Sequence, residues 1–439
     1  MSVDTGTRHP HARRASLAAF VGTVLEWYDF IIYGIAAAIV FNVLFFPTGA
    51  PILGTLGALG TFAVGFLARP LGGIVLGRFG DRHGRRSVLV ITLVLMGLST
   101  TAIGLLPTYE QAGIIAPILL VLMRLVQGFG AGAEYAGAVV LSVEHADPRR
   151  RGLAGTAAPL GFAVATILGN AVFGLFLLLP REEFLAWGWR VPFLLGAVCL
   201  LVGYLVRRGV EEPAEFEQVR GSAPCRAGVL ASFRAQPRSF LTVVMARIGE
   251  SAFAYLLPVF GVAYVATTLG LGSSVALTAM LVASAVQALM LPLCGLAADR
   301  YGRKTVYLTG TLLSIAWMAP FFLLTETGAF GAVIAAFVVG VGVVYPMMQS
   351  AQATWFAELF DAEFRMSGFA IAREAGTIVG GGLAPLAATA LFAWSGQWWL
   401  VVVLMVVLLS VTVCGLLLGR ETLVNTGRDR DAVDVPATP

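Results

Sequence analysis

Long apolar segments alternate with short polar or glycine- and proline-rich breaks along nearly the whole 439-residue chain. The segments are continuously apolar and lack the every-second-residue alternation of membrane barrel strands. A helix needs about 20 apolar residues to cross a hydrocarbon core of about 30 Å. The pattern therefore predicts an all-α membrane protein with twelve transmembrane helices. The predicted spans are residues 17–46, 53–79, 87–106, 113–142, 153–179, 189–207, 240–268, 276–298, 305–324, 329–357, 367–393 and 397–419.

The composition agrees with a surface that faces lipid. Hydrophobic residues make up 58% of the chain and charged residues only 12%, whereas soluble domains carry about 25% charged residues. The segment from Met1 to Arg14 is polar, and the apolar run after it is too long for the core of a signal peptide. We therefore expect no cleavable signal.

The basic residues predict the orientation. Most of the 29 lysines and arginines lie in the two tails and in every second loop. By the positive-inside rule these regions are cytoplasmic, so both termini are expected in the cytoplasm. An even number of spans requires the same arrangement. The net charge of +4 thus reflects topology, and no nucleic-acid partner is expected.

One motif occurs twice. Gly77-Arg-Phe-Gly-Asp-Arg-His-Gly-Arg-Arg86 recurs as Gly295-Leu-Ala-Ala-Asp-Arg-Tyr-Gly-Arg-Lys304, each time at the end of an even-numbered span. A parallel repeat of two six-helix halves is predicted, with a substrate site at the repeat interface. The predicted divisions are a cytoplasmic tail at 1–16, the halves at 17–207 and 240–419, a cytoplasmic linker at 208–239 and a second tail at 420–439.

The repeated motif has a mechanical interpretation. Its aspartate can accept hydrogen bonds near a helix end, and its arginines can pair with neighbouring helices. We expect such a polar latch to hold one face of the protein closed in one conformation. The alternative is that the basic residues only set the topology. The predicted latch residues are Asp81, Arg82, Arg85, Asp299, Arg300 and Arg303.

Several charged residues lie inside the predicted spans, where a charge costs about 2.5–3.5 kcal/mol on insertion scales. Glu26 and Asp29 lie about 60° apart on one helix face, with Tyr33 between them. Arg247 and Glu250 are also three residues apart, on the seventh span. The first and seventh spans occupy equivalent positions in the two halves, so both sets are expected to face a central cavity.

These residue types suit the transport of an anion with a proton. Buried arginine binds carboxylate in a bidentate manner and keeps its charge, while a buried carboxylate can exchange a proton near neutral pH. The alternative is that several of them are structural ion pairs, notably Arg124 with Glu134, or that Arg69 braces the second span. The predicted substrate-binding residues are Tyr28, Tyr33, Arg124, Gln127, Arg247 and Arg373. The predicted proton-coupling residues are Glu26, Asp29, Glu134 and Glu250.

Other chemistry is not indicated. The four cysteines and four histidines are scattered and form no cluster with metal-ligand spacing. The chain carries no nucleophile elbow or phosphate-binding loop. We therefore expect neither enzymatic activity nor a cofactor or metal.

The two loop motifs resemble the signature of the major facilitator superfamily. The segment Gly22-Thr-Val-Leu-Glu-Trp-Tyr-Asp-Phe-Ile-Ile-Tyr-Gly34 narrows the resemblance to the metabolite:proton symporter family. That family includes carriers of shikimate, citrate, α-ketoglutarate and proline or betaine. The resemblance continues through Arg69-Pro-Leu-Gly-Gly73, Arg124-Leu-Val-Gln-Gly-Phe-Gly-Ala-Gly-Ala-Glu134, Trp187-Gly-Trp-Arg-Val-Pro-Phe193 and Gly380-Gly-Gly-Leu-Ala-Pro385.

The resemblance implies a major facilitator fold and associates Arg124 with proton coupling. Span 11 departs from the family pattern, because Arg373-Glu374 stands where members usually carry an uncharged aromatic–amide pair. Adjacent helical residues lie about 100° apart. Either one lines the cavity while the other pairs with a neighbouring helix, or a loop boundary lies here.

We expect a secondary active transporter in a bacterial plasma membrane, which acts as a monomer by alternating access. Its expected reaction is the symport of a proton with a small organic acid, such as a mono-, di- or shikimate-like carboxylate. The expected partners are this substrate, the proton and the lipid bilayer. The alternatives are a carrier of a zwitterionic or neutral solute, such as a betaine, amino acid or polyol, and an exporter of the same superfamily.

Overall fold

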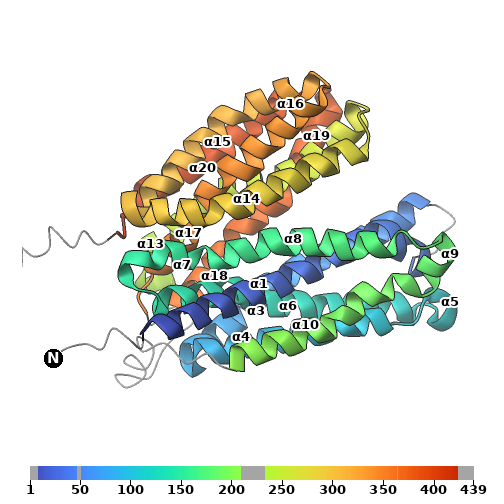
Figure 1. The fold of residues 1–439 in the computed structure, drawn as a ribbon, viewed down its shortest axis with the longest axis horizontal. Helices are drawn as coiled ribbons and strands as arrows, with labels where there is room; N and C mark the ends of the chain where they lie inside the picture. The colour runs from blue at the N-terminus through green and yellow to red at the C-terminus, as the bar shows by residue number, and fades with distance from the viewer. Residues whose placement is uncertain (1–7, 47–50, 209–232, 363, 424–439) are drawn as a thin grey trace, which may run out of the picture.

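The computed structural model describes residues 8–46, 51–208, 233–362 and 364–423. These residues form a bundle of long helices in two groups, as Figure 1 shows. The first half of the chain, blue to green, makes one group, and the second half, yellow to red, makes the other.

Six long helical segments build the first half. In chain order the elements are α1 (Arg8–Ala36), η1 (Ala37–Phe41), α2 (Asn42–Leu44), α3 (Pro51–His83), α4 (Arg85–Leu105), α5 (Tyr109–Ala112), α6 (Ile115–His145), η2 (Pro148–Arg150), α7 (Arg151–Gly155), α8 (Ala157–Phe176), α9 (Arg181–Glu183), η3 (Phe184–Gly188) and α10 (Arg190–Arg208).

Six more segments build the second half. Its elements are α13 (Pro237–Leu256), η4 (Leu257–Gly261), η5 (Tyr264–Thr268), α14 (Ser273–Tyr301), α15 (Arg303–Glu326), α16 (Phe330–Phe337), η6 (Val338–Val344), α17 (Tyr345–Glu358), α18 (Arg365–Thr377), η7 (Ile378–Leu383), α19 (Ala384–Ser395) and α20 (Trp398–Leu418).

The predicted twelve-helix fold is confirmed. Among the described residues, 11 helices are long and apolar enough to cross a membrane. The remaining predicted span, 53–79, lies within α3, which is 33 residues long. The first helix begins at Arg8 and not near residue 17. A helix satisfies its own backbone hydrogen bonds, so it can continue past the point where the apolar run ends.

Both copies of the repeated motif form the same sharp turn between two helices. Gly84 lies between α3 and α4 with φ of 105°, and Gly302 lies between α14 and α15 with φ of 104°. Glycine adopts positive φ without the steric cost that a Cβ atom adds. The last glycine of each repeat is therefore required by the turn itself.

Glycines also let α3 and α6 cross at very short range. A Cβ atom at Gly132 would lie 2.0 Å from the carbonyl oxygen of Arg69, and one at Gly72 would lie 1.8 Å from that of Phe129. No side chain fits between the two backbones, as in other small-residue helix crossings in membranes. This crossing fixes the position of Arg69 relative to α6.

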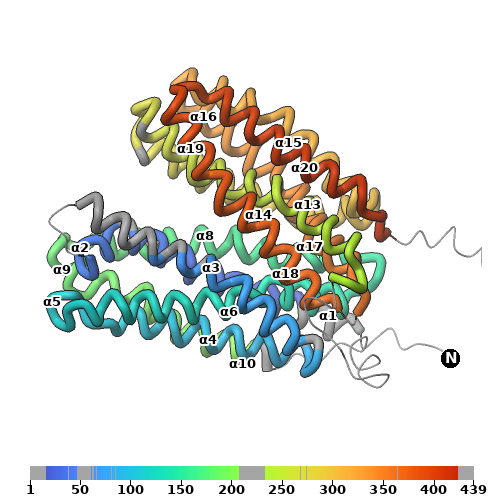
Figure 2. Tube along the Cα trace, turned by 180° about the vertical axis from the view of Figure 1, so that it is seen from behind, coloured from blue at the N-terminus to red at the C-terminus, as the bar shows by residue number. Residues whose placement is uncertain are grey.

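The two halves converge at one end and diverge at the other. In Figure 1 they meet near α7, α17 and α18 and separate toward α9 and α16, and Figure 2 shows the same divergence from behind. The repeat turns at Gly84 and Gly302 belong to the converging end. By the charge pattern of the loops, this end is predicted to be cytoplasmic.

Candidate functional site

Nine charged side chains are buried within the described parts of the spans predicted from the sequence. They come from both halves and are carried by α1, α3, α6, α13 and α18. This central charged group consists of Glu26, Asp29, Arg69, Arg124, Glu134, Arg247, Glu250, Arg373 and Glu374. Such charges are costly inside a bilayer unless they are paired or have a function.

One chain of ion pairs runs from the first half to the second. Glu26 on α1 pairs with Arg69 on α3. The Arg69 Nε atom lies 3.9 Å from Oε2 of Glu374 on α18, and Glu374 also accepts a hydrogen bond from Arg373. Two carboxylates and two guanidiniums therefore alternate across the boundary between the halves.

A second set of contacts surrounds Arg247 within the second half. The Arg247 guanidinium pairs with Glu250 and donates from Nε to Oγ1 of Thr377 at 2.9 Å. Oε1 of Glu250 accepts from Gln352 Nε2 at 2.7 Å and from the Tyr345 hydroxyl at 3.1 Å. The carboxylate is thus held by partners on α13 and α17.

A third set surrounds Arg124 within the first half. Nη1 of Arg124 donates to Oε1 of Gln127 at 2.5 Å, and Gln127 Nε2 donates to Oγ1 of Thr100 at 2.7 Å. The guanidinium carbon lies 4.1 Å from the ring centre of Tyr33, close enough for a cation–π contact. Asp29 interacts with the same three polar residues, Thr100, Arg124 and Gln127.

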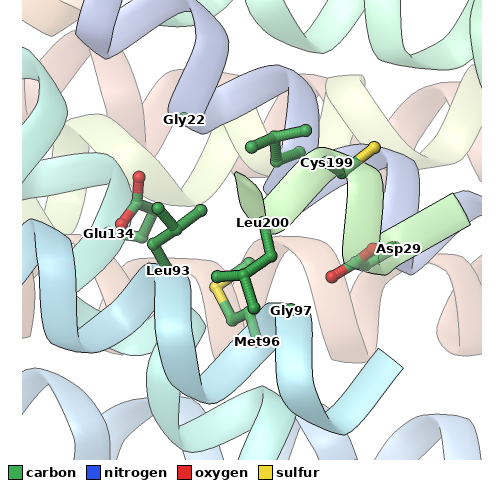
Figure 3. Close-up of a pocket in the computed structure, with 10 residues that line it drawn as sticks. Gly22, Asp29, Leu93, Met96, Gly97, Glu134, Cys199 and Leu200 are labelled. Atoms are coloured by element: carbon green, nitrogen blue, oxygen red, sulfur yellow. The ribbon is translucent and has the colours of Figure 1, made fainter. Parts of the chain in front are cut away.

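A small cavity separates two acidic residues of the first half. It holds about 10 Å³, the space of roughly one water molecule. Figure 3 shows Asp29 and Glu134 at its two sides, with Leu93, Met96 and Leu200 between them. Glu134 also accepts a hydrogen bond from the hydroxyl of Thr92.

The structure separates some residues that the sequence grouped. Glu26 and Asp29 lie on one helix, yet Glu26 pairs with Arg69 while Asp29 interacts with the Arg124 set. The Tyr28 hydroxyl donates to the carbonyl oxygen of Pro192 at 2.9 Å. Tyr28 therefore faces α10, and its proposed contact with substrate stays a prediction.

Arg373 and Glu374 both lie within α18, so no loop boundary occurs there. They pair with each other although adjacent positions point about 100° apart, because both side chains are long. Glu374 and the polar partners Tyr345 and Gln352 were not among the predicted site residues. A polar residue inside an apolar span was the available signal for all three.

The second copy of the repeated motif contacts the first half. Asp299 accepts hydrogen bonds from the backbone nitrogens of Gly152 at 2.6 Å and Leu153 at 2.9 Å. Arg303 lies 3.2 Å from Asp299 and 3.4 Å from Glu358. The two bonds of Asp299 join α14 to α7 across the boundary between the halves, and the contacts of Arg303 lie within the second half.

Two further bonds cross the same end of the molecule. Arg365 pairs with Glu144 at 2.8 Å, and the Thr354 hydroxyl donates to the carbonyl oxygen of Arg151 at 2.9 Å. Arg300 is exposed, with its guanidinium carbon 5.5 Å from the Tyr301 ring centre.

The first copy of the motif is only partly described. Arg82 is exposed, and the side chains of Asp81 and Arg85 lie outside the described residues. Within the described part of the chain, no group of three His, Cys, Asp or Glu side chains has the arrangement of a metal site.

Comparisons with known proteins agree with this architecture. The Major Facilitator Superfamily profile matches residues 19–285 and 239–438. The Shikimate transporter of Escherichia coli (strain K12) is 39% identical over 392 residues, which cover 88% of this chain and 90% of that protein. The Proline/betaine transporter of the same strain is 32% identical, over 86% of this chain and 77% of that protein.

Among solved structures, the proton:xylose symporter XylE superposes with a TM-score of 0.75 at 18% identity and covers 93% of this chain and 95% of that chain. At that identity the match supports the fold alone. The chain belongs to the major facilitator superfamily, and within it to the metabolite:proton symporter family. It is a multi-pass membrane transporter, as its spans and its relatives show together.

Proposed function

We propose that this protein carries a small organic acid together with a proton by alternating access. The supporting observation is the central charged group, in which arginines of both halves lie beside buried carboxylates. Arginine binds a carboxylate substrate in a bidentate manner, and helices of both halves must contact the substrate if their relative motion is to move it.

Arg247 and Arg373 are the proposed substrate clamps. Each is 4% exposed, whereas Arg124 and Glu250 are 0% exposed, so an incoming acid reaches the first two before the others. Arg124, Gln127 and Tyr33 then hold the first-half side of the group.

The proton is carried by a carboxyl of the central charged group. Glu26, Asp29, Glu134 and Glu250 are the candidates from the sequence, and the small cavity adds a place for one water between Asp29 and Glu134. A single chain is enough to form the proposed site, because the site is built from residues of both halves of that chain.

Two contacts at the converging end support a latch. Asp299 joins the second half to α7 of the first, Arg303 holds Asp299 from within the second half, and the halves diverge at the other end. With the converging end cytoplasmic, this conformation is the outward-facing one. Asp81, Arg82, Arg85 and Arg300 remain proposed members of the latch.

A zwitterionic substrate is the second candidate, favoured by the 32% identity to the Proline/betaine transporter. Purified protein in liposomes distinguishes the two. We expect uptake of radiolabelled shikimate to rise when the outside is made acidic, and to fall when a protonophore removes the gradient. R247Q should lose acid uptake, because the neutral amide cannot balance a carboxylate.

Two results decide against the acid. If no acid in a panel of mono- and dicarboxylates is stimulated by an inward proton gradient, the proposal is wrong. If glycine betaine is taken up and R247Q transports it unchanged, the charges serve only as pairs and the second candidate replaces the first. Substrate accumulation that occurs only when an outward-directed proton gradient drives it would identify an antiporter, and therefore an exporter.

A further inference from the structure

Two neighbouring residues of α18 reach the first half through different helices. The guanidinium carbon of Arg373 lies 4.0 Å from the ring centre of Tyr135 on α6. Oε2 of Glu374 lies 3.9 Å from Nε of Arg69 on α3. Because the two residues also pair with each other, they join the halves inside the membrane as well as at its surface.

Arg373 has capacity for a second carboxylate. Its Nη1 donates to Glu374, while its Nε is buried without a hydrogen-bond acceptor. A buried donor without an acceptor is costly, and a planar carboxylate satisfies two neighbouring guanidinium donors at once. The ring of Tyr135 holds the guanidinium plane in position for this contact.

Several charged groups surround Glu374. Arg69 faces it from α3, Arg373 adjoins it on α18, and Glu26 reaches the same cluster from α1. Among the described residues, the other titratable or charged groups that interact with this cluster are Asp29 on α1, Arg124, Glu134 and Tyr135 on α6, and Arg247 and Tyr255 on α13.

Charge balance then connects the substrate to a proton. Glu26, Arg69, Glu374 and Arg373 together carry no net charge when all four are ionised. A substrate carboxylate on Arg373 adds one negative charge, and a net charge is costly inside the membrane. One proton on one carboxyl restores neutrality, so one proton enters for each carboxylate.

Building on the proposed symport of an acid, we infer that Glu374 is the carboxyl that takes up this proton when a substrate carboxylate occupies Nε of Arg373. Glu374 is the carboxylate that contacts both arginines, and it lies beside the new anion on the same guanidinium. Its protonation frees Arg373 for the substrate and weakens its attraction to Arg69. Protonation therefore loosens the contact between the halves at the step where they must part.

The test compares wild type with E374Q in liposomes, with shikimate as the probe. Glutamine has the shape of a protonated glutamate and cannot release a proton. In wild type, KM should rise about tenfold per pH unit once Glu374 is ionised, because one proton binds with each anion. In E374Q, KM should change less than twofold over the same range. Shikimate exchange without a gradient should persist, and accumulation driven by a pH gradient should be lost.

E326Q is the matched control. Glu326 is an exposed carboxylate of the same half that accepts a hydrogen bond from Trp398 at 2.7 Å, so its loss changes the charge equally without touching the central group. It should keep the wild-type pH profile.

The outcomes separate this inference from the proposed function. If the gradient drives uptake in both wild type and E374Q, the proton lies on another carboxyl and this inference alone is wrong. If wild type itself shows no gradient-driven uptake of any acid, both are wrong. A purely structural role would lower the exchange rate of E374Q and leave its pH dependence as in wild type, which also contradicts the inference. If E374Q does not accumulate in the membrane, E374D must displace the pH midpoint of KM, and an unchanged midpoint overturns the assignment.

Discussion

The contacts of Asp299 lead to a quantitative prediction about the closed end. Its carboxylate accepts two backbone hydrogen bonds from α7, at 2.6 and 2.9 Å. Hydrogen bonds to a charged group contribute about 1.5–3 kcal/mol each and neutral ones about 0.5–1.5 kcal/mol. The two bonds go to different oxygens of Asp299, and D299N turns one of these oxygens into an amide nitrogen that cannot accept. The variant therefore loses one bond and removes the charge from the other, so it should destabilise the closed end by about 2.5–4.5 kcal/mol.

This energy corresponds to a roughly 60- to 1,600-fold shift of the equilibrium between the closed and open arrangements at that end. Arg303 keeps its contact with Glu358 in the variant, so the second half itself should remain folded. We therefore expect the halves to separate more often at the converging end without loss of the protein from the membrane.

Cysteine accessibility measures this separation. Thr354 is 0% exposed, and a Cβ atom at Gly155 of the other half would lie 2.1 Å from its hydroxyl oxygen. T354C, in a chain whose four native cysteines are replaced by serine, should react slowly with a membrane-impermeant maleimide in inside-out vesicles. Adding D299N should raise the rate at least tenfold.

D361N is the control for this experiment. Asp361 is exposed and pairs with Gln236 of its own half, so its substitution changes the same residue type without crossing the boundary. A labelling rate of T354C that is the same with and without D299N would refute the latch, as would an equal increase with D361N.

Two further variants test the packing and pairing between helices. G132A should lower the melting temperature of the purified protein by several degrees or prevent its accumulation, because the added methyl group would lie 2.0 Å from the carbonyl oxygen of Arg69. An unchanged melting temperature, measured by fluorescence-detected size exclusion, would contradict the close crossing of α3 and α6. R365E should speed labelling of T354C because the new carboxylate repels Glu144. R365E/E144R should restore the slow rate, because the exchanged charges re-form the pair that lies at 2.8 Å in the native protein. If the double variant still labels fast, this pair does not hold the two halves together.

The fold was predictable because hydrophobic length and charge asymmetry are local properties of the sequence. Each span had to be about 20 apolar residues long whatever its neighbours were. The repeat between Gly77 and Arg86 and between Gly295 and Lys304 then divided the spans into two halves. Only the ends of the helices were uncertain, as the early start of α1 at Arg8 illustrates.

The partners of the buried charges were not predictable in the same way. The spacing of three residues correctly placed Arg247 and Glu250 on one face of a helix, where they form an ion pair. It gave no information on which helix faces which, so the link from Glu26 through Arg69 to Glu374 required the three-dimensional packing. The anchoring of Asp299 on the backbone of α7 is equally invisible in the sequence, because every residue has a backbone nitrogen.

The glycine crossing of α3 and α6 has a consequence for how motion spreads through the protein. With backbones this close, a shift of either helix by one residue would place a side chain where only glycine fits, at Gly72 or Gly132. The two helices therefore move together as one rigid body. Arg69 belongs to this rigid pair and holds Glu26 of α1. A displacement of α18 is therefore transmitted from Glu374 to α1 through the Arg69 guanidinium, and no flexible loop intervenes.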